Sequence, residues 1–155
     1  MDKARQLLDA LLDCGLTLAT AESCTGGLLG KEITDLSGSS AAYLGGVISY
    51  SNEVKHQILG VSQDDLDSFG AVSKPVAIQM AEGVRRVIGS DLGVGITGIA
   101  GPNSDNTQKP VGLVYLAASN GEQTLVREQH FSGDRSAVRA QSCAAAIDLL
   151  MELLG

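Results

Sequence analysis

Hydrophobic residues recur along this chain with two alternating spacings, which predict its secondary structure. Near the N-terminus, Leu7, Leu8, Leu11 and Leu12 fall on one face of a helix, and Gly15 follows as a stop signal. Farther along, short apolar runs alternate with amphipathic stretches. Helices are expected over residues 3–13, 25–35, 52–60, 63–69 and 74–88 and after an N-cap at Asp134, and strands over residues 16–21, 43–51, 91–98, 111–118 and 123–131.

The order of these elements predicts an α/β fold. Alternating helices and strands favour parallel strands with helices on both faces of the sheet. The last two strands are joined by the sequence SNGE at 119–122, which is typical of a hairpin, so the sheet should be mixed. We see no repeat or linker, and we expect a single three-layer α/β/α domain over residues 1–155 with a mixed β-sheet.

Composition narrows the function classes. The chain has 155 residues, of which 44% are hydrophobic and 19% charged, as in a globular protein. A formal charge of -7 and only 3% aromatic residues argue against nucleic-acid binding. Three cysteines without a CxxC motif suit a reduced compartment, and the charged N-terminus does not resemble a signal peptide. No apolar run is long enough to span a membrane. We therefore expect a cytoplasmic protein without nucleic-acid or membrane partners.

Two phosphate-binding motifs and a metal site are disfavoured. A P-loop ending at Lys31 would need a glycine at position 25 and a hydroxyl at position 32, where the chain has Thr25 and Glu32. Residues 93–98 match GxGxxG, but Pro102 and a polar loop follow in place of a helix. Small residues of a buried strand packed under a helix explain that match better. Two isolated histidines provide no zinc motif, so no metal is expected.

The segment TAESCTGG at 20–27 is a candidate nucleophile turn. Ser23 lies where an apolar strand passes into a glycine-rich helix start. Backbone N–H groups and a partial positive charge at such a position can bind an anion or stabilise an oxyanion. The alternative is that Ser23 or Thr25 is only a helix N-cap, and the local sequence leaves both open.

A serine nucleophile needs a base, and several groups are candidates. Lys55 can serve if burial lowers its pKa, with Tyr50 placed to orient it or share a proton. The alternative for Lys55 is an exposed helix lysine. His56 is the one plausible histidine base, and Cys24 is a rival nucleophile unless it is a buried, inert thiol.

Three ordered segments together resemble a known family. They are TAESCTGG (20–27), GGVISYSNEVK (45–55) and GITGIAGP (95–102), the last followed by KPVG. With GAVS, MAEGVR and FSGDR in the same order, the chain resembles the CinA C-terminal domain family, also called the nicotinamide-nucleotide amidase family. The resemblance extends from about residue 3 to residue 152.

The resemblance implies an activity and a site. Family members hydrolyse the carboxamide of nicotinamide mononucleotide to nicotinate mononucleotide and ammonia, a step of pyridine-nucleotide salvage, without a metal or organic cofactor. It implies Ser23 as nucleophile, Lys55 as base, Tyr50 as their partner, and a homodimer. We expect oxyanion or substrate contacts from Thr25, Gly26 and Gly27, from the pocket residues Thr97, Gly98 and Gly101, and, for the phosphate, from Arg135 and Arg139. For the two arginines, solvated positions on the last helix are the alternative.

One segment departs from the family pattern. Relatives usually carry two glycines in GPxGG, whereas this chain has Ser104 and Asp105 in the loop from Asn103 to Asn106. A side chain there can obstruct a close backbone approach to a nucleotide. The alternative function is therefore a pyridine-nucleotide-binding or regulatory module with little or no amidase activity. Some relatives also carry an N-terminal pyrophosphatase-type domain, and we expect no pyrophosphatase activity from this chain.

Overall fold

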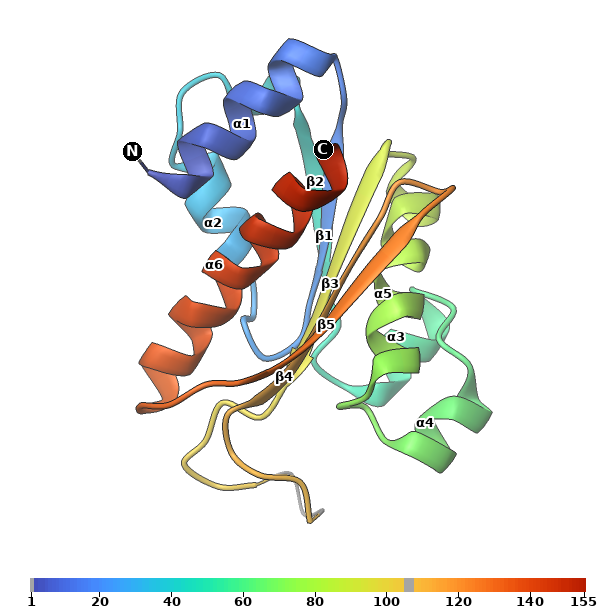
Figure 1. The fold of residues 1–155 in the computed structure, drawn as a ribbon. Helices are drawn as coiled ribbons and strands as arrows, with labels where there is room; N and C mark the ends of the chain where they lie inside the picture. The colour runs from blue at the N-terminus through green and yellow to red at the C-terminus, as the bar shows by residue number, and fades with distance from the viewer. Residues whose placement is uncertain (1, 105–107) are drawn as a thin grey trace.

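A five-stranded mixed β-sheet forms the middle layer of the computed structural model, which describes residues 2–104 and 108–155 (Figure 1). The strand order is β2-β1-β3-β4-β5. β1 is parallel to β2 and to β3, whereas β3–β4 and β4–β5 are antiparallel. The expected mixed sheet is therefore confirmed. The strands are β1 (Leu18–Glu22), β2 (Tyr43–Ile48), β3 (Leu92–Gly98), β4 (Leu113–Ser119) and β5 (Thr124–His130).

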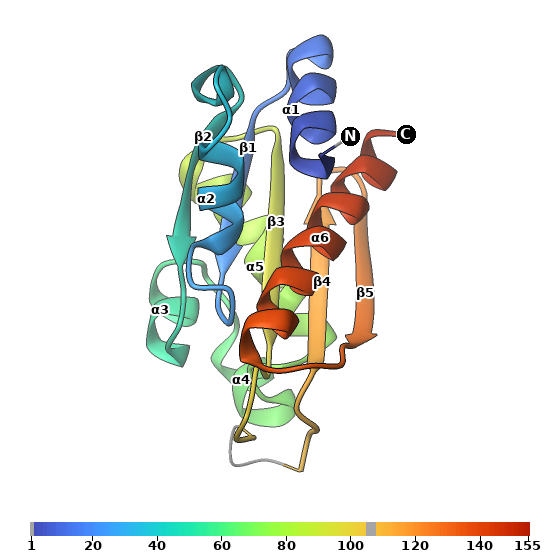
Figure 2. The same ribbon diagram turned by 90° about the vertical axis from the view of Figure 1, so that its left-hand side faces the viewer.

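Helices cover both faces of this sheet, as expected for a three-layer fold (Figures 1 and 2). On one face lie α1 (Lys3–Cys14), α2 (Leu28–Thr34) and α6 (Arg135–Leu154). On the other lie α3 (Asn52–Gln57), α4 (Gln63–Phe69) and α5 (Lys74–Ile88). A short 3-10 helix, η1 (Ser39–Ala41), precedes β2.

Alternate residues of the central strand β1 supply the two cores. Leu18 packs with the apolar faces of α1, α2 and α6, whereas Ala19 and Ala21 pack with those of α4 and α5. All five residues of β1 are buried, as is usual for a parallel strand covered on both faces. The central strand is thus fixed from both sides, and so is the turn that follows it.

The glycines of β3 allow α5 to approach the sheet closely. A Cβ atom on Gly93 would lie 2.2 Å from the carbonyl oxygen of Ala81, and one on Gly95 would lie 2.8 Å from that of Ala77. Side chains at these positions would therefore displace the helix. The GxGxxG match is explained by this packing and not by a dinucleotide-binding loop.

Several element boundaries differ by a few residues from the sequence-based expectation. α2 begins at Leu28 with Gly27 as its N-cap, because Gly26 and Gly27 have φ values of 59° and 105° and extend the turn. The N-cap of α3 is Ser51, whose hydroxyl accepts a hydrogen bond from the Val54 N–H at 3.2 Å. β2 ends at Ile48, three residues earlier than expected.

The final helix begins as expected, because Asp134 accepts a hydrogen bond from the Ala137 N–H. Asp105 and Asn106, which belong to the altered loop, lie outside the described residues.

Candidate active site

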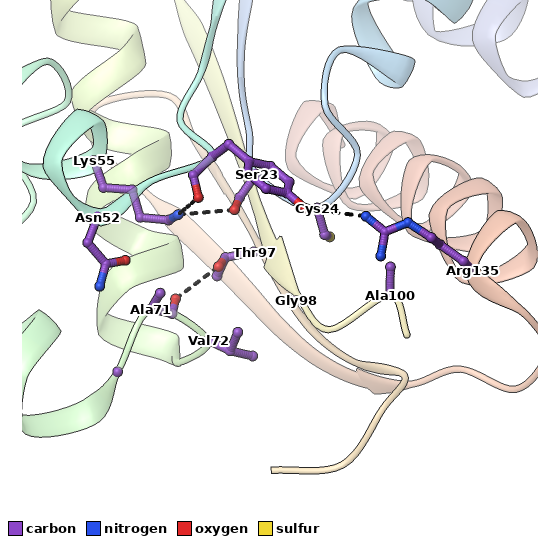
Figure 3. A pocket seen from close by; sticks show the side chains of 12 residues that line it. Ser23, Cys24, Asn52, Lys55, Ala71, Val72, Thr97, Gly98, Ala100 and Arg135 are labelled. Carbon is purple, nitrogen blue, oxygen red and sulfur yellow. Dashed lines mark hydrogen bonds between the residues drawn. The ribbon is translucent and has the colours of Figure 1, made fainter. Parts of the chain in front are cut away.

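The ends of the parallel strands meet at a pocket of about 360 Å³ (Figure 3). The chain leaves β1 for β2 on one side and later crosses to β3 on the other, so β1 marks a switch in strand order, where α/β proteins commonly bind ligands. The segments after β1, β2 and β3 all contribute. The lining residues are Ser23, Cys24, Tyr50, Asn52, Lys55, Gly70, Ala71, Val72, Thr97, Gly98, Ala100 and Arg135.

Ser23 is the first residue of a tight turn after β1. Its N–H donates to the carbonyl oxygen of Ile96 on β3 at 3.0 Å, and its carbonyl oxygen accepts from the Gly26 N–H at 3.1 Å. The hydroxyl lies five residues before α2 and does not cap that helix, whose N-cap Gly27 has no side-chain hydrogen bond. The helix-cap interpretation of Ser23 is therefore wrong, and its hydroxyl is available to the pocket.

Lys55 reaches Ser23 from the short helix α3. Its Nζ lies 3.0 Å from Ser23 Oγ (Figure 3). The same Nζ donates to the carbonyl oxygen of Ser49 at 2.7 Å. The residue is only 1% exposed. This burial excludes the interpretation of Lys55 as an exposed helix lysine.

Burial also changes the acidity of this amine. It lowers the pKa of Lys55 from 10.5 to about 8, because the ammonium form loses its hydration. Among the described residues, no carboxylate forms an ion pair with Lys55 that would restore the charge. At pH 7, about one molecule in ten then carries the neutral amine, against roughly one in three thousand for an ordinary lysine. The neutral form can accept the proton of Ser23.

The alternative base and the alternative nucleophile are less suitable. His56 Nδ1 is engaged with the carbonyl oxygen of Val61 at 2.7 Å, and the histidine does not line the pocket. Burial raises the pKa of the Cys24 thiol to about 11, so this group stays protonated at neutral pH. Ser23 and Lys55 are left as the pair that can act together.

Tyr50 and Arg135 form the opposite rim of the pocket. The Tyr50 hydroxyl accepts a hydrogen bond from Arg135 Nη2 at 3.3 Å, and Arg135 Nη1 donates to the carbonyl oxygen of Gly101 at 2.7 Å. Only the backbone carbonyl of Tyr50 approaches Lys55 Nζ, at 3.5 Å. The tyrosine hydroxyl therefore faces the arginine and not the lysine, which differs from the expected proton-sharing role.

Residues 70–72 form a wall of the pocket, and the sequence did not predict them as part of the site. Thr97 Oγ1 donates to the carbonyl oxygen of Ala71 at 2.9 Å, and Lys109 Nζ donates to those of Phe69 and Val72 at 2.5 and 2.6 Å. Thr97 thus contributes to the pocket, as expected, by fixing its wall. Asn52 also lines the pocket and was not among the expected site residues.

Other expected site residues support the turn and do not line the pocket. Thr25 is buried and donates to the Glu22 carboxylate at 2.8 Å, while Gly26 and Gly27 supply the positive φ values of the turn. Arg139 donates to main-chain carbonyl oxygens of the same turn, which differs from the phosphate-binding role expected for it.

Glu22 is a buried carboxylate beneath the turn and was overlooked in the sequence. Its exposure is 2%, and it accepts hydrogen bonds from the Leu29 N–H at 2.8 Å and the Gly30 N–H at 3.0 Å. Thr20 and Thr25 add hydroxyl donors at 3.1 and 2.8 Å. These contacts place a negative charge at the N-terminus of α2, where the helix dipole favours it. The only signal in the sequence was an acidic residue at the end of an apolar strand.

Comparisons with known proteins identify the family of this chain. Residues 1–154 match the family described as "CinA C-terminal domain". The chain belongs to this family. It is 50% identical over 140 residues to a "CinA-like protein" of Syntrophomonas wolfei, an alignment that covers 90% of this chain and 34% of the relative. The chain thus spans about a third of the length of the curated CinA relatives that it matches.

Solved CinA structures superimpose on almost the whole chain. The competence/damage inducible protein CihA from Agrobacterium tumefaciens gives a TM-score of 0.95 with 37% identity, covering 99% of this chain and 94% of that one. A CinA superfamily protein from Enterobacter cloacae gives 0.95 with 33% identity, covering 99% and 90%. The three-layer α/β/α fold of this chain is therefore the CinA fold.

The described residues contain neither a membrane-spanning helix nor a cluster of metal ligands. None of their helices has the length and apolar character needed to cross a membrane. Within residues 2–104 and 108–155, no three His, Cys, Asp or Glu side chains gather as metal ligands would.

Proposed function

We propose that this CinA-family chain is an amidohydrolase that converts nicotinamide mononucleotide and water to nicotinate mononucleotide and ammonia. The observation that carries the proposal is the 3.0 Å contact between Ser23 Oγ and the buried Lys55 Nζ at the edge of an open pocket. A serine beside a lysine of lowered pKa is the arrangement required for acyl transfer at neutral pH. The choice of substrate rests on the family resemblance.

In the acylation half-reaction, neutral Lys55 accepts the proton of Ser23 as Oγ attacks the carboxamide carbon. The carbonyl oxygen becomes an oxyanion, for which the N–H groups of Cys24 and Thr25 are the candidate donors, because the Gly26 N–H is bonded to the Ser23 carbonyl oxygen. Protonated Lys55 then gives its proton to the leaving nitrogen, and ammonia departs. The product is an ester between Ser23 and the nicotinoyl group.

In the deacylation half-reaction, Lys55 is neutral again and removes a proton from water. The resulting hydroxide attacks the ester, Ser23 Oγ leaves, and Lys55 returns the proton to it. Nicotinate mononucleotide then dissociates as the carboxylate. Arg135 lies at the pocket rim and can bind the substrate phosphate with the N–H groups that it does not donate to the Gly101 carbonyl oxygen and the Tyr50 hydroxyl.

Removing the serine hydroxyl tests the proposal directly. Ser23→Ala is expected to lower the rate of ammonia release from nicotinamide mononucleotide by about 10⁴-fold, because no acyl-enzyme can form. Ser37→Ala, which removes an exposed hydroxyl outside the pocket lining, serves as the control. Equal rates for wild type and Ser23→Ala would reject the mechanism. If the wild type releases no ammonia but nicotinamide mononucleotide raises its melting temperature, the binding-module alternative is favoured.

The pH dependence of the rate tests the role of Lys55. Because only the neutral amine accepts a proton, kcat/KM should rise about tenfold per pH unit below the pKa of Lys55 and level off above about 8. The profile is measured as initial rates of ammonia release from pH 5.5 to 9.5 at constant ionic strength. A profile that is flat between pH 6 and pH 8 would contradict Lys55 as the base.

A further inference from the structure

Arg139 connects helix α6 to the turn that carries Ser23. Its Nε donates to the carbonyl oxygen of Cys24 at 3.1 Å, and its Nη2 donates to that of Thr25 at 2.9 Å. One guanidinium thus holds two successive peptide groups, 114 and 115 residues away in the sequence. Its planar arrangement of donors suits such a double contact better than an ammonium group would.

These contacts determine where the carbonyl dipoles of the turn point. The carbonyl oxygen of Ser23 accepts from the Gly26 N–H, and that of Cys24 accepts from Arg139. The carbonyl oxygen of Thr25 accepts from Arg139 and also from the Leu28 N–H at 3.0 Å. Because a trans peptide directs its C=O and N–H to opposite sides, the N–H of Thr25 points away from the guanidinium. Among residues 2–104 and 108–155, no acceptor is found for that N–H.

The orientation matters for a negative charge that develops beside Ser23. Amide N–H groups stabilise an oxyanion, whereas a carbonyl oxygen turned toward it would repel it. The turn contains Gly26 and Gly27, which both have positive φ values. Because glycine has no Cβ atom, the peptide planes at these residues can rotate more easily than at other residues. Without Arg139, the carbonyl group of Cys24 would lose the one donor that it has among the described residues, and that of Thr25 would keep only the Leu28 N–H.

We propose that Arg139 is a positioning residue, which holds the peptides after Ser23 with their carbonyl oxygens directed away from the oxyanion. This inference rests on the proposed amidase function. It also gives Arg139 a different role from that of Arg135, which lines the pocket. A residue that acts on the turn affects the chemical step, whereas a residue that binds the phosphate affects substrate binding.

The first test compares Arg139→Gln, Arg139→Lys and the control Arg86→Gln in steady-state hydrolysis of nicotinamide mononucleotide. Arg86 is a suitable control because its guanidinium also donates to a loop carbonyl, that of Leu59 at 3.4 Å, away from the pocket. Arg139→Gln should lower kcat about 100-fold and change KM less than about threefold, as for the loss of an oxyanion contact. Arg139→Lys should recover about tenfold of that loss, because an ammonium can hold one of the two carbonyl oxygens.

The second test uses pyridine-3-boronic acid, which needs no amide hydrolysis. Ser23 Oγ adds to the trigonal boron, the hydroxyl proton passes to Lys55, and the tetrahedral boronate carries a negative charge at the oxyanion position. We expect the affinity, measured by titration with ¹¹B NMR, to fall about 100-fold in Arg139→Gln and less in Arg139→Lys. Thermal melting of each variant shows whether it folds. If Arg139→Gln does not fold, Arg139→Lys is compared with wild type instead.

The outcomes separate this inference from the proposed function. A rise in KM at unchanged kcat, or effects no larger than those of Arg86→Gln, would overturn the positioning role. A wild type that binds the boronate but does not release ammonia would reject the substrate, while the boronate series would still decide about Arg139. Failure of the wild type in both assays would overturn both proposals.

Discussion

Methionine in place of Lys55 is expected to lower the rate of amide hydrolysis by about four orders of magnitude. The variant keeps an unbranched apolar stem, one atom shorter than that of lysine, but has no group that can accept the Ser23 proton or deliver one to ammonia. Lys31→Met is the matched control, since Lys31 is an exposed lysine on α2 that pairs with Asp35. Ammonia release under single-turnover conditions gives the comparison. A loss of less than tenfold would mean that another group is the base.

The same variant should be more stable than wild type at neutral pH. The folded protein holds the Lys55 pKa near 8 and the unfolded chain near 10.5, so the unfolded state binds more protons between these values. Stability of the wild type therefore rises with pH across this window and is reduced below it. The difference in unfolding free energy between wild type and Lys55→Met should shift by about 3 kcal/mol in favour of wild type from pH 7 to pH 10.5.

Chemical denaturation at both pH values measures this shift. At pH 7, hydrogen bonds lost at Ser49 and Ser23 offset part of the gain, which leaves the variant about 1–2 kcal/mol more stable. A difference that does not change with pH would show that burial does not alter the Lys55 pKa. The catalytic base would then have to work from an ordinary lysine.

Replacing Glu22 with glutamine is expected to destabilise the fold by about 2–4 kcal/mol. One carboxylate oxygen would become an NH₂ group, which would face donors such as the Leu29 or Gly30 N–H in a site that is closed to water. Buried donors without an acceptor cost more than the hydrogen bond itself. Because Glu22 also holds the Thr25 hydroxyl, the turn that carries Ser23 should loosen as well.

The measurement is equilibrium unfolding at pH 7, with Glu152→Gln as control. Glu152 is an exposed carboxylate of α6 paired with Arg127, and the loss of such a pair costs at most about 1 kcal/mol. A change at Glu22 as small as that at Glu152 would show that the buried carboxylate does not support the turn.

Local patterns were enough to predict the layers and the mixed sheet. The helical spacing of leucines in α1, the buried run of β3 and the SNGE hairpin each depend on nearby residues, and each was found where expected. The end of β2 and the start of α2 were less predictable. Their positions depend on a ladder with β1 and on two glycines of positive φ, which tertiary contacts select.

The site was predictable only in part. Ser23 and Lys55 were candidates because a strand precedes each, but the sequence could not show that Lys55 is buried or that His56 turns toward Val61. Arg139 was misplaced for a similar reason. An arginine near the N-terminus of a helix can bind either a phosphate or a carbonyl oxygen. Only the packing of α6 against the turn shows that Arg139 donates to carbonyl oxygens.

The glycines of β3 have a consequence for the size of the substrate. They let α5 lie close to the sheet, and α5 begins directly after the Gly70–Val72 wall of the pocket. An added methyl group at Gly95 would move the helix outward and carry this wall with it. Residues buried in the middle of the sheet, which never contact a substrate, thereby set the width of the opening through which it enters.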